Sequence, residues 1–199
     1  MRKIIKVERK KNSMKERVAG SLLIFASLQL FFSIIVSEGM YEGYHTNNNM
    51  ISDLGVGKTA IIFNTAMVLQ GLCAAIAAYY ILQIFKQKII FYTMLLSSLG
   101  AIIVGIFPET IIVPHAAGAF LVFFFGGIAA ILSQKFFPST TPVFTTLGAI
   151  SILFFLLFSL AWFNGLKSGV LERMIAYPLI FWEFGAGILL YNRESAKNK

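Results

Sequence analysis

The stretch VAGSLLIFASLQLFFSIIVS, residues 18–37, decides the class of this protein. It contains no charged residue, and its twenty residues, as an α-helix, would cross the roughly 30 Å hydrocarbon core of a bilayer. Eight Lys and Arg residues stand in the seventeen positions before it. A basic head before an apolar run is also typical of a signal peptide, but this run is too long and no small-residue cleavage pattern follows it. We therefore expect a retained first transmembrane helix.

The composition of the whole chain agrees with this expectation. Apolar residues make up 57% of the chain and charged residues 13%, against about 25% charged residues in soluble domains. The net charge of +8 is concentrated ahead of the first span, which indicates an orientation signal rather than a nucleic-acid surface. The one cysteine, Cys73, excludes an internal disulfide and offers no cysteine metal cluster. The sequence predicts an integral membrane protein whose partners are membrane lipids, without nucleic acid.

Outward from residues 18–37, five more apolar runs follow, separated by short polar or proline-containing connections. We expect an all-α bundle of six transmembrane helices between a basic segment at 1–17 and a charged tail at 192–199. Thr59 would cap the second span, Phe107 would end the third before Pro108, and Pro114 would open the fourth. The predicted spans of this domain, residues 18–191, are 18–37, 59–85, 89–107, 115–134, 143–163 and 174–191.

The distribution of basic residues predicts how the bundle lies in the membrane. Six spans place both termini on one side, and fourteen of the seventeen Lys and Arg residues fall on that side. Lys58, Lys167 and Arg173 are the exceptions. By the positive-inside rule, both termini should lie in the cytoplasm, with the protein in the cytoplasmic membrane. Two polar loops, residues 38–58 and 164–173, would then face outward.

One eye-catching motif does not carry a function. Gly55-Val56-Gly57-Lys58-Thr59 resembles the end of a phosphate-binding loop, G-x-x-x-x-G-K-[ST]. The leading glycine of that pattern is replaced by Ser52, and no strand precedes it. Its predicted position outside the membrane also keeps it away from cytoplasmic nucleotide. We expect a turn that leads into a helix, and no nucleotide as a partner.

A set of polar residues should gather at the outer ends of the spans. His115 lies in the first turn of its predicted helix, where the helix dipole favours neutral imidazole. A neutral His near an acid can be a general base or a metal ligand, so Asp53 and His115 are the catalytic candidates. Alternatively, these side chains cap helices and hold loops together. The sequence identifies no cofactor and no defined metal site. The candidate ligand-binding residues of this set are Ser52, Asn64, Glu109, Glu172 and Arg173.

A second candidate lies deeper. Glu183 falls near the middle of the sixth span, at a depth where an ionisable side chain should face the bundle interior and find a partner. It is a functional candidate for that reason. Equally, it can be a protonated Glu that is hydrogen-bonded to Gln29 or Gln70 and joins helices.

The polar motifs also carry a resemblance. In order along the chain stand Ile51-Ser52-Asp53-Leu54-Gly55, Phe63-Asn64, Gly105-Ile106-Phe107-Pro108, His115 and Gly169-x-x-Glu172-Arg173. Between about Val18 and Tyr191 the chain resembles the DUF998 family of prokaryotic membrane proteins, and more distantly the eukaryotic Frag and DRAM six-span proteins. The family resemblance implies a six-span fold and places its motif residues on the outer polar set. The distant one implies a connection with lipid remodelling and organelle membranes.

Three function classes stay open at this point. The first is an outward-facing lipid enzyme in which Asp53 and His115 act and Arg173 holds an anionic head group, although no Gly-x-Ser-x-Gly nucleophile motif is present. The second is a small transporter or proton-linked carrier that uses Glu183. The third is a non-catalytic assembly partner whose polar motif is a structural clasp. We favour a lipid-associated membrane protein with a polar site for head-group binding or remodelling, and keep the carrier as the alternative.

Overall fold

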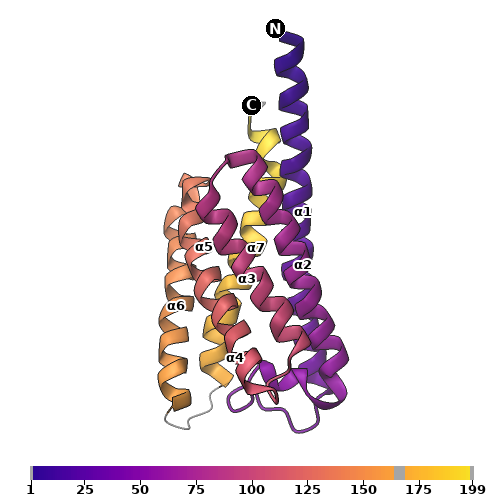
Figure 1. Ribbon diagram of the computed structural model, residues 1–199, viewed down its shortest axis with the longest axis vertical. Helices are drawn as coiled ribbons and strands as arrows, with labels where there is room; N and C mark the ends of the chain where they lie inside the picture. Colours follow the sequence, from indigo (N-terminus) through magenta and orange to yellow (C-terminus); the bar gives the residue numbers. More distant parts are fainter. Residues whose placement is uncertain (1, 164–168, 198–199) are drawn as a thin grey trace.

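The computed structural model describes residues 2–163 and 169–197, with side chains for residues 12–140, 142–161 and 169–193. It is a bundle of long helices (Figure 1). The α-helices are α1 (Arg2–Met40), α2 (Ala60–Phe85), α3 (Lys88–Ile106), α4 (Ile112–Phe120), α5 (Gly126–Leu132), α6 (Thr141–Phe163) and α7 (Gly169–Lys197). A π-helical turn, η3 (Leu121–Phe125), joins α4 to α5. Short 3-10 turns are η1 (Ser52–Gly55), η2 (Gly57–Thr59), η4 (Ser133–Lys135) and η5 (Pro138–Thr140).

Among the described residues, six helical segments are long and apolar enough to cross a membrane, with α4, η3 and α5 forming one of them. Each has at least the roughly 17–25 residues that the hydrocarbon core requires, and the backbone hydrogen bonds of a helix are satisfied within it there. The predicted all-α fold with six spans is confirmed.

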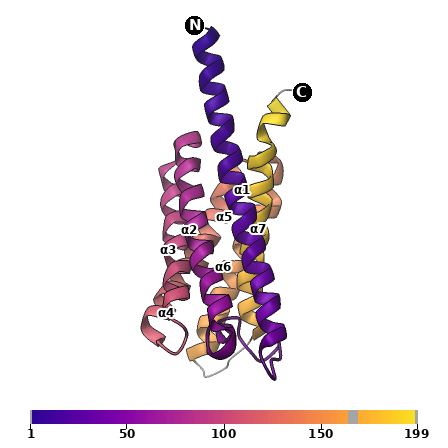
Figure 2. The same ribbon diagram turned by 90° about the vertical axis from the view of Figure 1, so that its right-hand side faces the viewer.

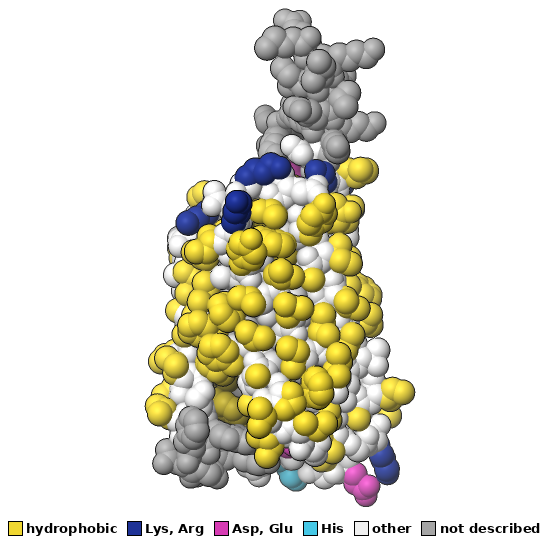
Figure 3. All heavy atoms as spheres, viewed as in Figure 1, with side chains coloured by type: hydrophobic (Ala, Val, Ile, Leu, Met, Phe, Trp, Pro, Cys, Tyr) yellow, Lys and Arg dark blue, Asp and Glu magenta, His cyan; other side chains and the backbone are white. Residues whose placement is uncertain are grey.

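The six spans form a closed ring. α1 packs against α2 and α7, α2 packs against α3, and α3 packs against the α4–α5 span. α6 completes the ring between α5 and α7. Both termini lie at one end, here called the terminal end (Figures 1 and 2). The opposite end carries residues 41–59, which connect α1 to α2, and is called the loop end. Lys and Arg side chains gather at the terminal end (Figure 3).

Close glycine contacts hold neighbouring spans together. A Cβ atom at Gly20 of α1 would lie 2.6 Å from the carbonyl oxygen of Gly187 in α7. A Cβ atom at Gly100 of α3 would lie 2.6 Å from the carbonyl oxygen of Gly118 in α4. Lipid gives no hydrophobic drive for helices to associate, so close backbone approach at small residues supplies the packing energy.

The first and last helices are longer than the predicted spans. α1 runs without interruption from the basic head to Met40, so Glu38 belongs to its last turn rather than to a loop. α7 begins at Gly169, which places Glu172 and Arg173 in a helix instead of the predicted loop at 164–173. Residues 164–168 of that loop lie outside the described residues, and α7 extends through the predicted tail to Lys197.

Two predicted helix starts also differ. α4 begins at Ile112, so Pro114 is its third residue and not its first. Thr59 does precede α2, but its hydroxyl does not cap that helix; it donates to the carbonyl oxygen of Leu54 at 2.8 Å. The third span ends at Ile106, one residue earlier than predicted, and Phe107 before the proline is already extended.

Candidate functional site

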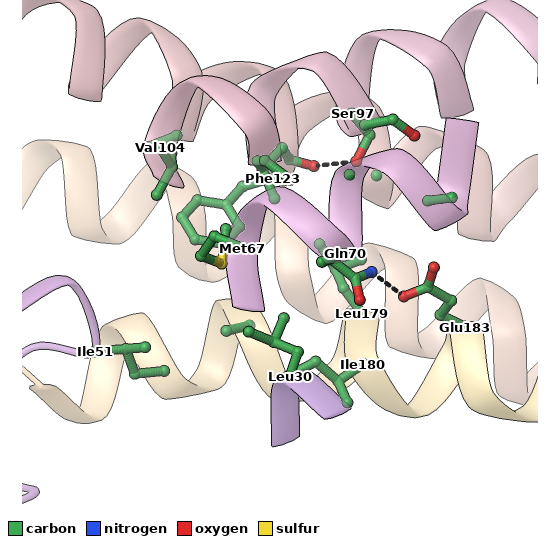
Figure 4. A pocket seen from close by; sticks show the side chains of 18 of the residues that line it. Leu30, Ile51, Met67, Gln70, Ser97, Val104, Phe123, Leu179, Ile180 and Glu183 are labelled. Atoms are coloured by element: carbon green, nitrogen blue, oxygen red, sulfur yellow. Dashed lines mark hydrogen bonds between the residues drawn. The ribbon is translucent and has the colours of Figure 1, made fainter. Parts of the chain in front are cut away.

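A central cavity of about 110 Å³ lies inside the ring of helices. Side chains from α1, α2, α3, the α4–α5 span and α7 line it, and none of the described α6 residues does. At the loop end its walls include Ser52, His115 and Glu172. Near mid-bundle they include Gln70 and Glu183 (Figure 4). The rise of α7 between Glu172 and Glu183 is roughly 16 Å at 1.5 Å per residue, so one cavity joins two polar ends.

At the loop end of the cavity, Arg173 holds the 41–59 connection to the bundle. Its Nη1 donates to the carbonyl oxygens of Thr46 at 2.8 Å, Asn49 at 2.9 Å and Gly169 at 2.9 Å. Its Nη2 donates to Glu38 Oε1 at 2.6 Å and to the Tyr44 hydroxyl oxygen at 2.7 Å. The guanidinium therefore ties α7, α1 and the connection together, and Arg173 does not line the cavity.

Tyr44 extends this arrangement into the connection. Its hydroxyl accepts from Arg173 and donates to the carbonyl oxygen of Met50 at 2.8 Å. Burial raises the pKa of the Tyr44 phenol above its ordinary value of 10, and this outweighs the lowering effect of Arg173. The neutral phenol is thus kept as a donor to the loop.

Gly169 and Glu172 hold the connection from the first turn of α7. A Cβ atom at Gly169 would lie 2.5 Å from the carbonyl oxygen of Thr46 and closer still to that of Asn49. Glu172 is 7% exposed, and its Oε2 accepts from the backbone N–H groups of Ile51 and Ser52, the latter at 3.3 Å. A buried carboxylate needs such donors to offset the loss of water.

Asp53 and Asn64 serve the same connection. Asp53 Oδ2 accepts from Asn49 Nδ2 at 2.9 Å and from the Met50 backbone N–H at 3.1 Å. Asn64 of α2 donates through Nδ2 to the carbonyl oxygen of Gly55 at 3.0 Å. Neither side chain lines the cavity. We call residues 41–59, with Glu38, Asn64, Gly169, Glu172 and Arg173, the clasp.

His115 has a different position. Its Nδ1 lies 2.8 Å from the carbonyl oxygen of Phe107. Because a carbonyl only accepts, Nδ1 carries a proton in this contact, and Nε2 is the nitrogen left for another partner. His115 lines the cavity, whereas half-buried Glu109, in the turn between α3 and α4, does not. No metal-binding group of three His, Cys, Asp or Glu side chains occurs among the described residues.

Near mid-bundle, Glu183 of α7 meets Gln70 of α2. Glu183 is 6% exposed, and Gln70 Nε2 donates to its Oε2 (Figure 4). Gln70 Oε1 is buried and has no hydrogen-bond partner among the described residues. Of the two predicted amide partners, Gln70 makes the contact, and Gln29 instead donates to the carbonyl oxygen of Ala66 at 3.0 Å.

The sequence motifs form one connected unit. Gly105 packs on the backbone of Asn64, where an added Cβ would lie 2.6 Å from the Asn64 carbonyl oxygen. Phe107 holds His115, and the Gly169-x-x-Glu172-Arg173 turn holds the connection that carries Ile51–Gly55. A family profile described as protein of unknown function (DUF998) matches residues 24–189.

The chain belongs to the DUF998 family. No curated protein and no solved structure matches it significantly.

In this DUF998 protein, the predicted site residues separate into two groups. Those that line the cavity are Ser52, His115, Glu172 and Glu183. Those that do not are Asp53, Asn64, Glu109 and Arg173. The catalytic roles of Asp53 and His115 stay a prediction, and the two side chains are not joined by a hydrogen bond among the described contacts.

Sequence reasoning missed part of the clasp. Glu38 and Tyr44 hold Arg173, and Gly169 admits the loop, yet none of the three was a candidate. A buried arginine near a membrane surface needs acceptors, so the acid at the end of the first span was the available signal.

Proposed function

We propose that this protein binds a membrane lipid in the central cavity, with an apolar chain between the helices and the head group at Ser52 and His115. The walls between the polar ends are largely hydrocarbon and aromatic, including Leu30, Met67 and Val104. Such a surface suits an acyl or prenyl chain, and a few convergent polar groups orient a ligand.

The observation that carries the proposal is the continuity of this cavity from the loop end to mid-bundle. Ser52 and His115 stand at its loop end, where a hydroxyl and an imidazole nitrogen can hydrogen-bond a head group. Asp53 and Arg173 are engaged in the clasp, so in this proposal they position the site rather than touch the lipid.

Native mass spectrometry of the protein released from lipid nanodiscs tests the proposal. The wild type should retain one lipid per chain. Ala74→Leu, which fills part of the cavity from α2, should lose it, whereas Ala75→Leu, at a position outside the lining, should keep it. A wild-type chain that emerges free of lipid, or an Ala74→Leu chain that retains lipid as the wild type does, contradicts the proposal.

Lipid analysis of cells then separates binding from remodelling. If the protein changes head groups, deletion of its gene alters the membrane lipid profile, and His115→Ala reproduces the change in a folded protein. An unchanged lipid profile in the deletion strain would exclude head-group remodelling, and lipid binding would remain as the proposed function.

A proton-linked carrier is the second candidate, and Glu183 favours it. This carboxyl is buried within the spans and lines the cavity, where ionisable groups commonly serve transport. A carrier predicts pH-driven flux in proteoliposomes that Glu183→Gln abolishes. Flux that is equal in wild type and Glu183→Gln would exclude this role for the residue.

We further propose that the terminal end faces the cytoplasm of a cell whose cytoplasmic membrane holds the protein. Fourteen of the seventeen Lys and Arg residues support this orientation. A cysteine introduced at exposed Lys86 in a Cys73→Ala background should resist an impermeant maleimide in intact cells, and one at exposed Lys58 should react. The reverse pattern contradicts the orientation.

A further inference from the structure

We infer that the mid-bundle end of the cavity is a separate binding site for the ammonium group of a small lipophilic amine, held by Glu183 and Gln70. The inference goes beyond the proposed lipid site. It rests on the other end of the cavity and stands whether or not a head group binds at Ser52 and His115.

This end of the cavity has more hydrogen-bond acceptors than donors. Gln70 uses Nε2 on Glu183, which leaves Gln70 Oε1 buried without a partner (Figure 4). The hydroxyl of Ser97 donates to the Val122 carbonyl oxygen at 3.0 Å, and that of Ser98 donates to the Met94 carbonyl oxygen at 2.7 Å. These hydroxyl protons are therefore already engaged.

The indole N–H of Trp182 does not supply the missing donor either. It donates to Ser133 Oγ at 2.9 Å, so this N–H is already engaged. A buried acceptor without a donor costs free energy, and a ligand that brings N–H groups would recover it.

The charge of the lining points the same way. The described residues around the cavity include two carboxyl groups, Glu172 and Glu183, and no Lys or Arg. Two backbone N–H groups already meet Glu172, whereas Glu183 has one neutral amide. A buried carboxyl group ionises at low cost only beside a compensating positive charge, and an ammonium brings one charge with three donors. These donors match Glu183 and the free Gln70 Oε1.

The walls indicate what the rest of the ligand is. Phe63, Phe123 and Trp182 give the cavity aromatic surface, and Met67 and Met94 give it thioethers. Aromatic faces attract cations, and both side-chain types pack on hydrocarbon. The cavity of about 110 Å³ has room for a short apolar body, and an amine held at Glu183 would take the place of the end of a lipid chain. The ligand class is therefore a primary amine with a short apolar body.

Three probes with the same hexyl chain separate the effect of the ligand's charge from that of its hydrogen-bond donors. Hexylammonium carries both, hexyltrimethylammonium carries charge without N–H, and 1-hexanol carries one donor without charge. At neutral pH an alkylamine is protonated. In isothermal titration of the protein in nanodiscs, with empty nanodiscs subtracted, hexylammonium should bind at least about tenfold more tightly than either of the others. Binding of 1-hexanol as tight as that of hexylammonium overturns the inference.

Variants locate the site. Glu183→Gln should weaken hexylammonium at least about tenfold and leave 1-hexanol unchanged, because it removes the charge and keeps the shape. Gln70→Met should weaken hexylammonium more than hexyltrimethylammonium, because it removes the unpartnered acceptor. Gln29→Met is the matched control, since this amide does not line the cavity, and it should bind as the wild type does. Wild-type affinity in Glu183→Gln contradicts the site.

Thermal unfolding of each variant shows that it is folded before binding is compared. If Glu183→Gln does not fold, the three-probe comparison on the wild type and the Gln70→Met series still decide the inference. A wild-type protein that retains lipid in native mass spectrometry but binds hexylammonium no more tightly than 1-hexanol would overturn this site and leave the proposed lipid function standing.

Discussion

Glu172 and Glu183 lie on the same helix and are buried to nearly the same degree, 7% and 6% exposed, yet their surroundings differ. Glu172 accepts from two backbone N–H groups of the connection, so it completes the clasp. Glu183 meets one amide whose other atom has no partner. The difference teaches that burial of a charge does not mark function by itself. The two glutamates differ in their partners: the fold supplies those of Glu172, whereas those of Glu183 are incomplete.

The largest effect should follow loss of the clasp arginine. Arg173→Met removes five hydrogen bonds and leaves Glu38 without its cation, so the free energy of unfolding should fall by about 3–5 kcal/mol. Arg193→Met is the control on the same helix. Arg193 has an ion pair with Glu16 at 3.6 Å and lies over the Phe85 ring at the terminal end. Denaturant titration in detergent measures both, and equal losses would refute the special role of the clasp.

A smaller loss should follow Gly169→Ala. The added Cβ would collide with the carbonyl oxygens of Thr46 and Asn49, which should cost about 1–3 kcal/mol as the connection shifts away. Gly39→Ala, in the last turn of α1, meets nothing within 4 Å and should be neutral or slightly stabilising. Unfolding midpoints of the pair check this, and an unchanged Gly169→Ala midpoint contradicts the close approach.

Asp53→Asn should cost about 1 kcal/mol. The amide oxygen can still accept from Met50 N–H or Asn49, but it lacks the charge that strengthens these bonds. Glu42→Gln in the same connection should change nothing measurable, because Glu42 is 93% exposed and meets Lys58 at 4.0 Å. The thermal midpoint in detergent checks both. Asp53→Asn that is as stable as wild type would mean that Asp53 does not hold the loop.

Alkaline pH should reveal the neutral phenol of Tyr44. Its folded-state pKa is raised by burial, so its contribution is complete below about pH 10 and is lost as pH rises through the folded pKa. The phenolate absorbance of wild type minus that of Tyr44→Phe should therefore appear above the ordinary tyrosine range. A difference titration centred near the ordinary value contradicts burial of the hydroxyl in the clasp.

The smallest effect on stability should come from Glu183→Gln, within about 0.5 kcal/mol, because glutamine keeps the shape and an acceptor for Gln70. This variant sharpens the comparison, since a residue reserved for a ligand should be replaceable without harm to the fold. Unfolding in detergent measures it. A loss as large as that in Arg173→Met would make Glu183 a structural residue like Glu172.

The sequence predicted the number of spans because membrane thickness fixes the length of each apolar run. The approximate end of α3 followed from Pro108, because the residue before a proline disfavours the helical conformation. The start of α7 did not follow, because polar Glu172 and Arg173 are typical of a loop until their partners in residues 46–52 are known. The start of α4 was predicted at Pro114, whereas the helix begins two residues earlier. The turn of η3 has no proline or other local signal in Leu121–Phe125.

The residues of the site and their depth could be predicted from the sequence, but the contacts between their side chains could not. Depth along α7 singled out Glu183, but only packing decides that Gln70 faces it while Gln29 turns to Ala66. Topology placed Asp53, His115 and Arg173 at one end, yet which of them faces the cavity depends on side-chain direction. Burial pairs Arg173 with the connection and leaves His115 on the cavity wall.

A crystal structure grown from lipid mesophase tests the central claim most directly, because it shows the clasp and the contents of the cavity together. We expect the Arg173 and Glu172 contacts intact, with elongated density in the cavity between His115 and Glu183. A cavity that is closed by side-chain packing, or an ordered ligand held by Arg173 and Asp53 instead, would contradict the division between clasp and binding site.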